Sequence, residues 1–123
     1  MGEALKPRYI MTALLAVLVF LTYFDIFYFG GAVNNRPWYM DMVMHVLGGG
    51  FIAAALLSYK TDLSPLRVLV LVLVVALGWE IFEYFVNIFV GSAQDPVSDT
   101  VSDLVLGLTG AALAVFSFRE KRV

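Results

Sequence analysis

The sequence contains no cysteine and only one histidine among 123 residues. Without cysteine, the chain can form no disulfide and offers no thiolate to a metal ion. Charged residues are also scarce, at 15% of the chain, whereas hydrophobic residues make up 61%. A water-soluble domain of this length could not bury so much apolar surface in one core. The composition therefore indicates an integral membrane protein.

The chain also lacks long polar linkers, low-complexity tracts and room for a separate soluble domain. A helix needs about 20 apolar residues to cross a bilayer. Four segments are long enough, at approximately residues 9–29, 38–59, 65–89 and 97–118. The first of them is too long for a signal peptide and has no small-residue cleavage site, so we expect a retained helix. The sequence predicts an all-α integral membrane bundle of four transmembrane helices, in a single domain of residues 1–123.

Basic residues are almost absent from one side of this predicted bundle. If the first helix starts in the cytoplasm, all eight lysines and arginines except Arg36 fall on the cytoplasmic side. Cytoplasmic loops of membrane proteins are enriched in lysine and arginine. We therefore expect both termini in the cytoplasm and a multi-pass protein of the cell (inner or plasma) membrane.

Acidic residues gather on the opposite, extracytoplasmic side. Residues three or four positions apart share one face of a helix, so the acids fall on polar stripes. Small residues continue two of these stripes deeper into the membrane, and small residues mark close helix contacts. We expect the stripes to converge on one outward-opening pocket. The seven acids and the histidine of the outer half are Asp25, Asp41, His45, Glu80, Glu83, Asp95, Asp99 and Asp103.

Such a cluster is too unfavourable to be accidental. A carboxylate near mid-bilayer costs about 2.5 to 3.5 kcal/mol to insert, so Glu80, Glu83 and Asp103 together cost about 10 kcal/mol. Crowded acids either take up protons, with Glu80 or Glu83 hydrogen-bonded between helices, or need a cation. With no lysine or arginine in reach, a metal ion is the simplest neutraliser. An oxygen-rich site with one histidine favours Mg²⁺, Mn²⁺, Ca²⁺ or Zn²⁺. The expected ligands are Asp41, His45, Glu80, Glu83, Asp99 and Asp103, and the candidate catalytic residues are Glu80, Glu83 and His45.

Some of these residues also have purely structural explanations. Asp95 followed by Pro96 is typical of a helix start, with the aspartate as the cap. Asp25 lies near the expected interface and could face lipid headgroups. The glycines at positions 48–50 favour helix packing over a phosphate-binding loop.

Three segments carry a resemblance to known membrane proteins: MDMVMHVLGGGFIAAALL, ALGWEIFEYFVNIF and DPVSDTVSDLVLGLTGAALAV. Together they resemble the YjdF-like family of small bacterial inner-membrane proteins and, more remotely, the VanZ-like family linked to glycopeptide-antibiotic resistance. The most specific motifs are Asp-x-x-x-His, Glu-x-x-Glu and Asp-Thr-x-Ser-Asp. Met44 departs from the family pattern, which has glycine before the histidine, and the chain lacks the family's extra helices. The resemblance supports the motif set and implies no particular reaction.

The leading functional prediction is a metal-dependent hydrolase or transferase that acts on lipid or isoprenoid-phosphate headgroups. In it, a carboxylate outside the metal shell acts as general base on a bound water. Two alternatives stay open, a cation- or proton-binding transport module and a structural metal site in an envelope protein. Transport needs a polar path inward, whereas the inner halves of the helices hold mainly Gly, Ala, Val and Leu. We expect membrane lipids as partners and no nucleic acid, and a homo-oligomer stays open.

Overall fold

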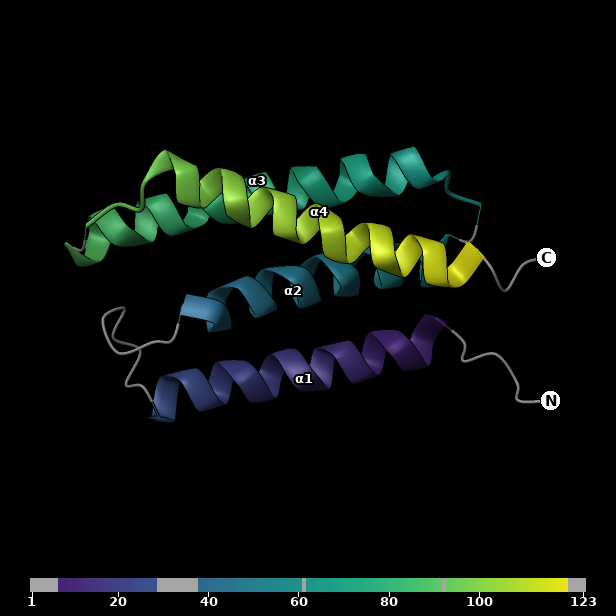
Figure 1. Ribbon diagram of the computed structural model, residues 1–123, viewed down its shortest axis with the longest axis horizontal. Coiled ribbons are helices and arrows are strands. Elements are labelled where there is room, and N and C mark those ends of the chain that lie inside the picture. Colours follow the sequence, from purple (N-terminus) through teal and green to yellow (C-terminus); the bar gives the residue numbers. More distant parts are fainter. Residues whose placement is uncertain (1–6, 29–37, 61, 92, 120–123) are drawn as a thin grey trace.

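The computed structural model describes residues 7–28, 38–60, 62–91 and 93–119 (Figure 1). The described residues form helices and short connections, with no strand among them. The predicted all-α fold is confirmed, and the predicted segments differ from the observed helices by at most two residues at any end. The helices are α1 (Pro7–Tyr28), α2 (Trp38–Tyr59), α3 (Pro65–Val90) and α4 (Val97–Arg119).

The four helices run alternately up and down along one long axis (Figure 1). As a result, α2 and α4 run in the same direction, and α1 begins at the end of the bundle where α4 finishes. Arg8, Lys60 and Arg67, which are the basic side chains of the described part, lie at this same end, at the start of α1 and around the α2–α3 connection. Charge is therefore segregated along the bundle axis, as the sequence predicts.

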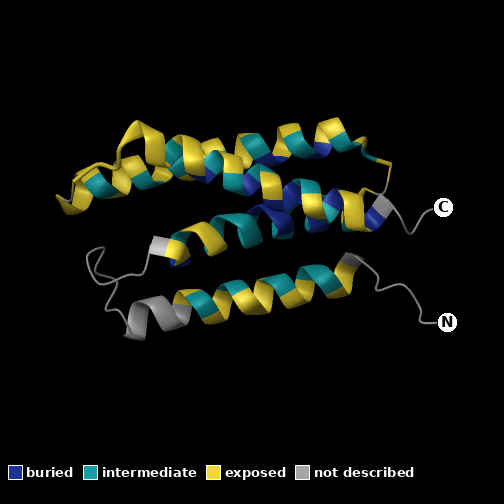
Figure 2. Cartoon of the chain, viewed as in Figure 1, coloured by how far each residue is buried: buried dark blue, intermediate teal, exposed yellow. Residues whose placement is uncertain are grey.

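Three helices are long and apolar enough to cross a membrane, over Tyr39–Tyr59, Pro65–Val90 and Val97–Phe118. The described side chains of α1 add a shorter apolar stretch, Arg8–Thr22. α3 is the least covered span, with 11% of its most apolar window buried inside the bundle against 33% for the other two (Figure 2). Its exposed side chains are large and apolar, as at Phe82, Phe85 and Phe89, which suits contact with lipid. These features fit a helical membrane bundle.

The buried core lies in the half of the bundle near the basic end. α2 packs most extensively on α4. α1 lies against α2, and α3 lies against α4 and, to a smaller extent, α2. Small residues allow membrane helices to approach closely, and alanines supply much of this core. The buried cluster consists of Ala53, Ala54, Leu57, Val68, Val72, Ala111, Val115 and Phe118.

Both ends of α3 are defined by local chemistry. The Ser64 hydroxyl accepts a hydrogen bond from the Arg67 amide at 3.3 Å, and Pro65 occupies the first turn. At the other end, Gly91 has φ of 71°, and its amide donates to carbonyls of the last turn of α3. A left-handed glycine is a common helix terminator. The next helix starts at Val97, where the Pro96 carbonyl accepts from the Thr100 amide, so Pro96 itself stands at the cap position that was expected for Asp95.

Candidate metal centre

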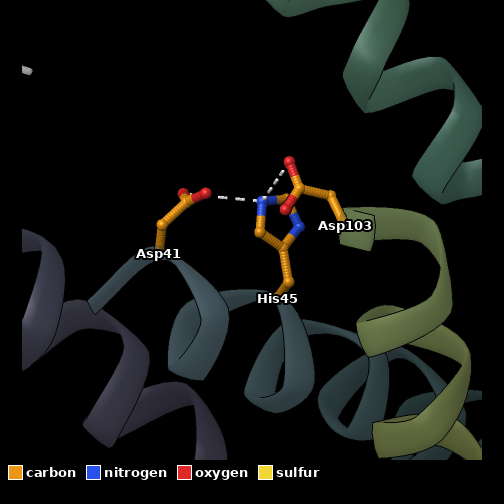
Figure 3. A group of neighbouring side chains, drawn as sticks. All are labelled: Asp41, His45 and Asp103. Carbon is orange, nitrogen blue, oxygen red and sulfur yellow. Dashed lines mark ion pairs between the residues drawn. The ribbon is translucent and has the colours of Figure 1, made fainter. Parts of the chain in front are cut away.

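The first two residues of the centre lie on one face of α2, near the end opposite the basic residues. Asp41 and His45 are four residues apart, so their side chains stand one above the other on the helix. The distance between His45 Nε2 and Asp41 Oδ1 is 3.6 Å (Figure 3). The Asp-x-x-x-His motif thus places a carboxylate beside the imidazole.

The third residue comes from α4. Asp103 Oδ2 lies 3.3 Å from the same His45 nitrogen, Nε2, so both aspartates converge on one atom of the histidine (Figure 3). Asp103 is the one buried charged residue of the described part, with 7% of its surface exposed. Burying an ionised carboxylate is costly unless the carboxyl is protonated or its charge is compensated by a partner. The partner that lies within reach of Asp103 is His45.

A close contact between the helix backbones brings Asp103 to His45. One turn beyond each of these residues along its helix stands a glycine, Gly49 on α2 and Gly107 on α4. A Cβ added at Gly49 would overlap the backbone of Gly107, so the two helices touch without intervening side chains. With larger residues at these two positions, side chains would hold α2 and α4 further apart. The small-residue stripe therefore sets the separation at which the polar residues above it meet.

The three side chains can hold a metal ion. One ligand atom from each of Asp41, His45 and Asp103 lies within 4.8 Å of the others. Ligand atoms about 2.1 Å from one ion stand about 3.0 to 3.4 Å apart in octahedral and tetrahedral sites. The measured separations of 3.3 and 3.6 Å are close to these values. Small side-chain movements would complete the site.

A proton on His45 Nε2 accounts for only one of the two carboxylates that approach this nitrogen. His45 Nε2 can carry one hydrogen, which makes one well-aligned hydrogen bond, while two carboxylates approach the same nitrogen. The 3.6 Å distance to Asp41 is also too long for a hydrogen bond. A cation placed between the three atoms would bind all of them. Side-chain exposure rises from 9% at Asp103 to 17% at His45 and 38% at Asp41, so the open side of the centre lies toward Asp41.

The remaining predicted residues lie outside this three-residue group. Glu80 of α3 is half-buried, has Thr100 of α4 as a polar neighbour, and interacts electrostatically with His45. Glu83 is also half-buried and lies beside Trp79, one turn earlier. Asp99 is exposed on the first turn of α4. The side chain of Asp25 lies outside the described residues.

The polar stripe of α3 nevertheless faces the bundle. Over the last three turns of α3, Glu80, Glu83 and Asn87 are partly covered, whereas the residues between them are exposed. Asn87 donates to Gln94 at 3.5 Å, and Gln94 donates to the Tyr84 carbonyl at 3.1 Å. The predicted glutamate stripe therefore borders the metal group with its acids only half covered.

Sequence reasoning missed two polar residues in this region. Thr100 of α4 is a polar neighbour of Glu80, and Gln94 links the α3–α4 connection to α3 through its hydrogen bond to the Tyr84 carbonyl. Thr100 was detectable, because it stands three residues before Asp103 and therefore on the same face of α4. Gln94 lies in a connection without helical periodicity, so no pattern pointed to it.

The fold and the centre define a class: an all-α membrane protein with an Asp–His–Asp group held between two helices near one end of the bundle. The chain belongs to a family described as predicted membrane proteins, DUF2238, whose sequence model matches residues 4–122. This match supports a membrane-protein family and does not single out the YjdF-like or VanZ-like families. The chain has no match among curated proteins or among solved structures.

Proposed function

We propose that this protein binds a divalent metal ion between Asp41, His45 and Asp103 and uses it in hydrolysis or group transfer at a phosphorylated lipid headgroup. The observation that carries the proposal is the convergence of three ligand atoms within 4.8 Å, drawn from two different helices. Mg²⁺, Mn²⁺, Ca²⁺ and Zn²⁺ all accept such a mixture of carboxylate oxygen and imidazole nitrogen.

The distribution of charge supports a centre on the extracytoplasmic side of the cell membrane. Arg8, Lys60 and Arg67 lie at one end of the described bundle, and the Asp–His–Asp group lies near the other. Because positive charge marks cytoplasmic ends, the basic end faces the cytoplasm. The centre then stands in the outer leaflet, at a depth where the phosphate group of a lipid or isoprenoid phosphate is available.

Asp41, His45 and Asp103 would hold the ion. When bound, a divalent ion would neutralise negative charge on a phosphate and would lower the pKa of a bound water molecule. In the proposed hydrolysis, a water oxygen forms a new bond to phosphorus while the bond from phosphorus to the lipid oxygen breaks. Glu80, half-buried beside the centre, accepts the proton of the attacking water, and the departing oxygen takes a proton from solvent. Glu83 and Asp99 are candidates for additional ligands.

The two alternative functions fare differently. A transport path would have to continue from the centre toward the basic end, where Ala53, Ala54 and Ala111 are fully buried and close the space between α2 and α4. This packing argues against transport. A structural metal remains a genuine competitor, because an ion shared by α2 and α4 would join the two central helices.

An activity assay separates the enzyme from the structural site. Purified protein in vesicles that contain phosphatidic acid or a polyprenyl phosphate should release inorganic phosphate, and EDTA should abolish the release. Glu80→Gln should lower the rate about 100-fold while the metal content stays unchanged, since loss of a general base typically costs this much. Asp62→Asn, an exposed acid at the opposite end, is the matched control. Metal-loaded protein with no activity on either lipid would support the structural site instead.

A further inference from the structure

Two glycines bring the backbones of α2 and α4 into direct contact. A Cβ added at Gly49 would overlap the carbonyl group of Gly107, and a Cβ added at Gly110 would overlap the carbonyl group of Val46. Neither obstacle is the flexible end of a side chain, so any side chain at these positions must push the helices apart. Gly49 and Gly110 thus set the separation of α2 and α4.

Other glycines on the same helices have no such role. A Cβ at Gly48 meets nothing within 4 Å, and a Cβ at Gly107 meets only the His45 carbonyl, at 3.9 Å. Gly50 is intermediate, because its added Cβ would lie 3.4 Å from the Gly110 carbonyl. Glycine-to-alanine changes on α2 and α4 therefore differ in the space that the added methyl group finds, from open space to overlap with the facing backbone.

The separation of the helices matters for the centre because α2 and α4 run in parallel with matched spacing. His45 precedes Gly49 by one turn, and Asp103 precedes Gly107 by one turn, so the polar pair lies directly beside the backbone contact. Asp103 has a single methylene between its carboxylate and its backbone and cannot follow a retreating helix. Its 3.3 Å approach to His45 therefore depends on the contact one turn away.

The geometry points to Gly49 and Gly110 as positioning residues, which hold α2 and α4 at backbone contact so that Asp103 reaches His45 and completes the metal-binding group. The effect of these glycines on metal binding rests on the proposed metal function. Their effect on the position of Asp103 rests on the glycine contact alone. Neither glycine touches the metal ligands' side-chain atoms, so each would act only through the position of Asp103.

The first test measures Mn²⁺ affinity by electron paramagnetic resonance of the full chain in detergent. Gly49→Ala and Gly110→Ala should each weaken Mn²⁺ binding about tenfold or more, as loss of supporting contacts around a metal typically does. Gly48→Ala is the matched control, on the same helix with the same change, and should bind within about twofold of the wild type.

A compensating substitution separates positioning from general damage. Asp103→Glu lengthens the side chain by one methylene, about the distance by which an added methyl group displaces the facing helix. In the Gly49→Ala background, Asp103→Glu should recover binding. In the wild-type background the same substitution should weaken it. A purely structural role for Gly49 predicts no such recovery.

The single histidine provides a second measurement that needs no metal. The ¹⁵N signals of the imidazole ring report the Asp103 contact, and Asp103→Asn defines their positions without it. At one fixed pH and with chelator present, Gly49→Ala should move the ring signals toward those of Asp103→Asn, whereas Gly48→Ala should not. If the wild type binds no Mn²⁺ but the ring signals move in this way, the metal function fails and the positioning role stands.

Unchanged ring signals and unchanged Mn²⁺ affinity in Gly49→Ala would overturn the inference. Equal effects of Gly48→Ala and Gly49→Ala would overturn it as well. If neither Gly49→Ala nor Gly110→Ala folds, Asp103→Glu in the wild-type background decides the matter, because helices held at backbone contact fit the shorter side chain. Unchanged ring signals and unchanged Mn²⁺ affinity in Asp103→Glu would contradict the role.

Discussion

His45 of α2 and Asp103 of α4 place Nε2 and Oδ2 3.3 Å apart, and one turn further along each helix the backbones of α2 and α4 are in contact. The pair thus combines a buried carboxylate with a direct backbone contact between α2 and α4. Because glycines let the two helices touch, the polar side chains one turn earlier come within reach of each other.

Metal should stabilise the folded protein through Asp103. At 100 times its Kd, a ligand that binds only the native state stabilises it by about 2.7 kcal/mol. We expect added Mn²⁺ or Zn²⁺ to raise the Tm of the wild type in detergent and to have little effect on Asp103→Asn, which loses a ligand. Asp62→Asn should respond like the wild type, because Asp62 is exposed in the α2–α3 connection. An equal rise in Asp103→Asn would contradict the assignment of this ligand.

Metal affinity should fall as the solution becomes more acidic. An imidazole nitrogen ligates only when it carries no proton, so proton and metal compete for Nε2. Below the midpoint of this competition, the affinity should drop about tenfold for each pH unit through the histidine alone. Titration calorimetry at several pH values measures the slope. In His45→Ala, the residual binding should lose this component, and an unchanged slope would show that carboxylates alone govern it.

Replacing the glycine that ends α3 should destabilise the protein, whereas replacing a glycine inside α3 should not. Gly91 adopts φ of 71°, where a residue with a Cβ is disfavoured, so Gly91→Ala should lower the free energy of unfolding by about 1 kcal/mol. Gly78 stands within the same helix with open space around it, and Gly78→Ala should be neutral or slightly stabilising. Unfolding in mixed micelles compares the two variants. Equal losses would mean that the αL conformation is not the cause.

The protein should not conduct ions across a bilayer. Beneath the centre, the described core is closed by Ala53, Ala54 and Ala111, which are fully buried. Liposomes with the reconstituted protein should therefore show proton and divalent-cation leakage equal to that of empty liposomes. Flux that depends on Asp103 would favour the transport alternative and would contradict a core closed by these alanines.

The sequence predicted the fold well because the bilayer constrains it strongly. Apolar length fixed the four segments within a residue or two, since a spanning helix needs about 20 apolar residues and must satisfy its backbone internally. The ends of α3 also follow local rules, with Ser64 and Pro65 at the start and Gly91 at the finish. These features depend on neighbouring residues only.

The candidate site was predicted in part. The four-residue spacing on one helix predicted that Asp41 and His45 share a face, and the small residues predicted close helix contacts without saying which helices meet. Periodicity does not fix the rotation and register of one helix against another. For this reason the sequence could not show that Asp103 reaches His45 while Asp99, one turn earlier, is exposed. It also could not distinguish Gly48, which faces open space, from Gly49, which contacts α4.

Elemental analysis of the purified protein tests the central claim most directly. Wild type, Asp103→Asn and Asp62→Asn would be purified without chelator and measured by inductively coupled plasma mass spectrometry. We predict about one divalent ion per chain in the wild type and in Asp62→Asn, and its loss in Asp103→Asn. Metal-free wild type, or equal metal in all three proteins, would contradict a metal site formed by Asp41, His45 and Asp103.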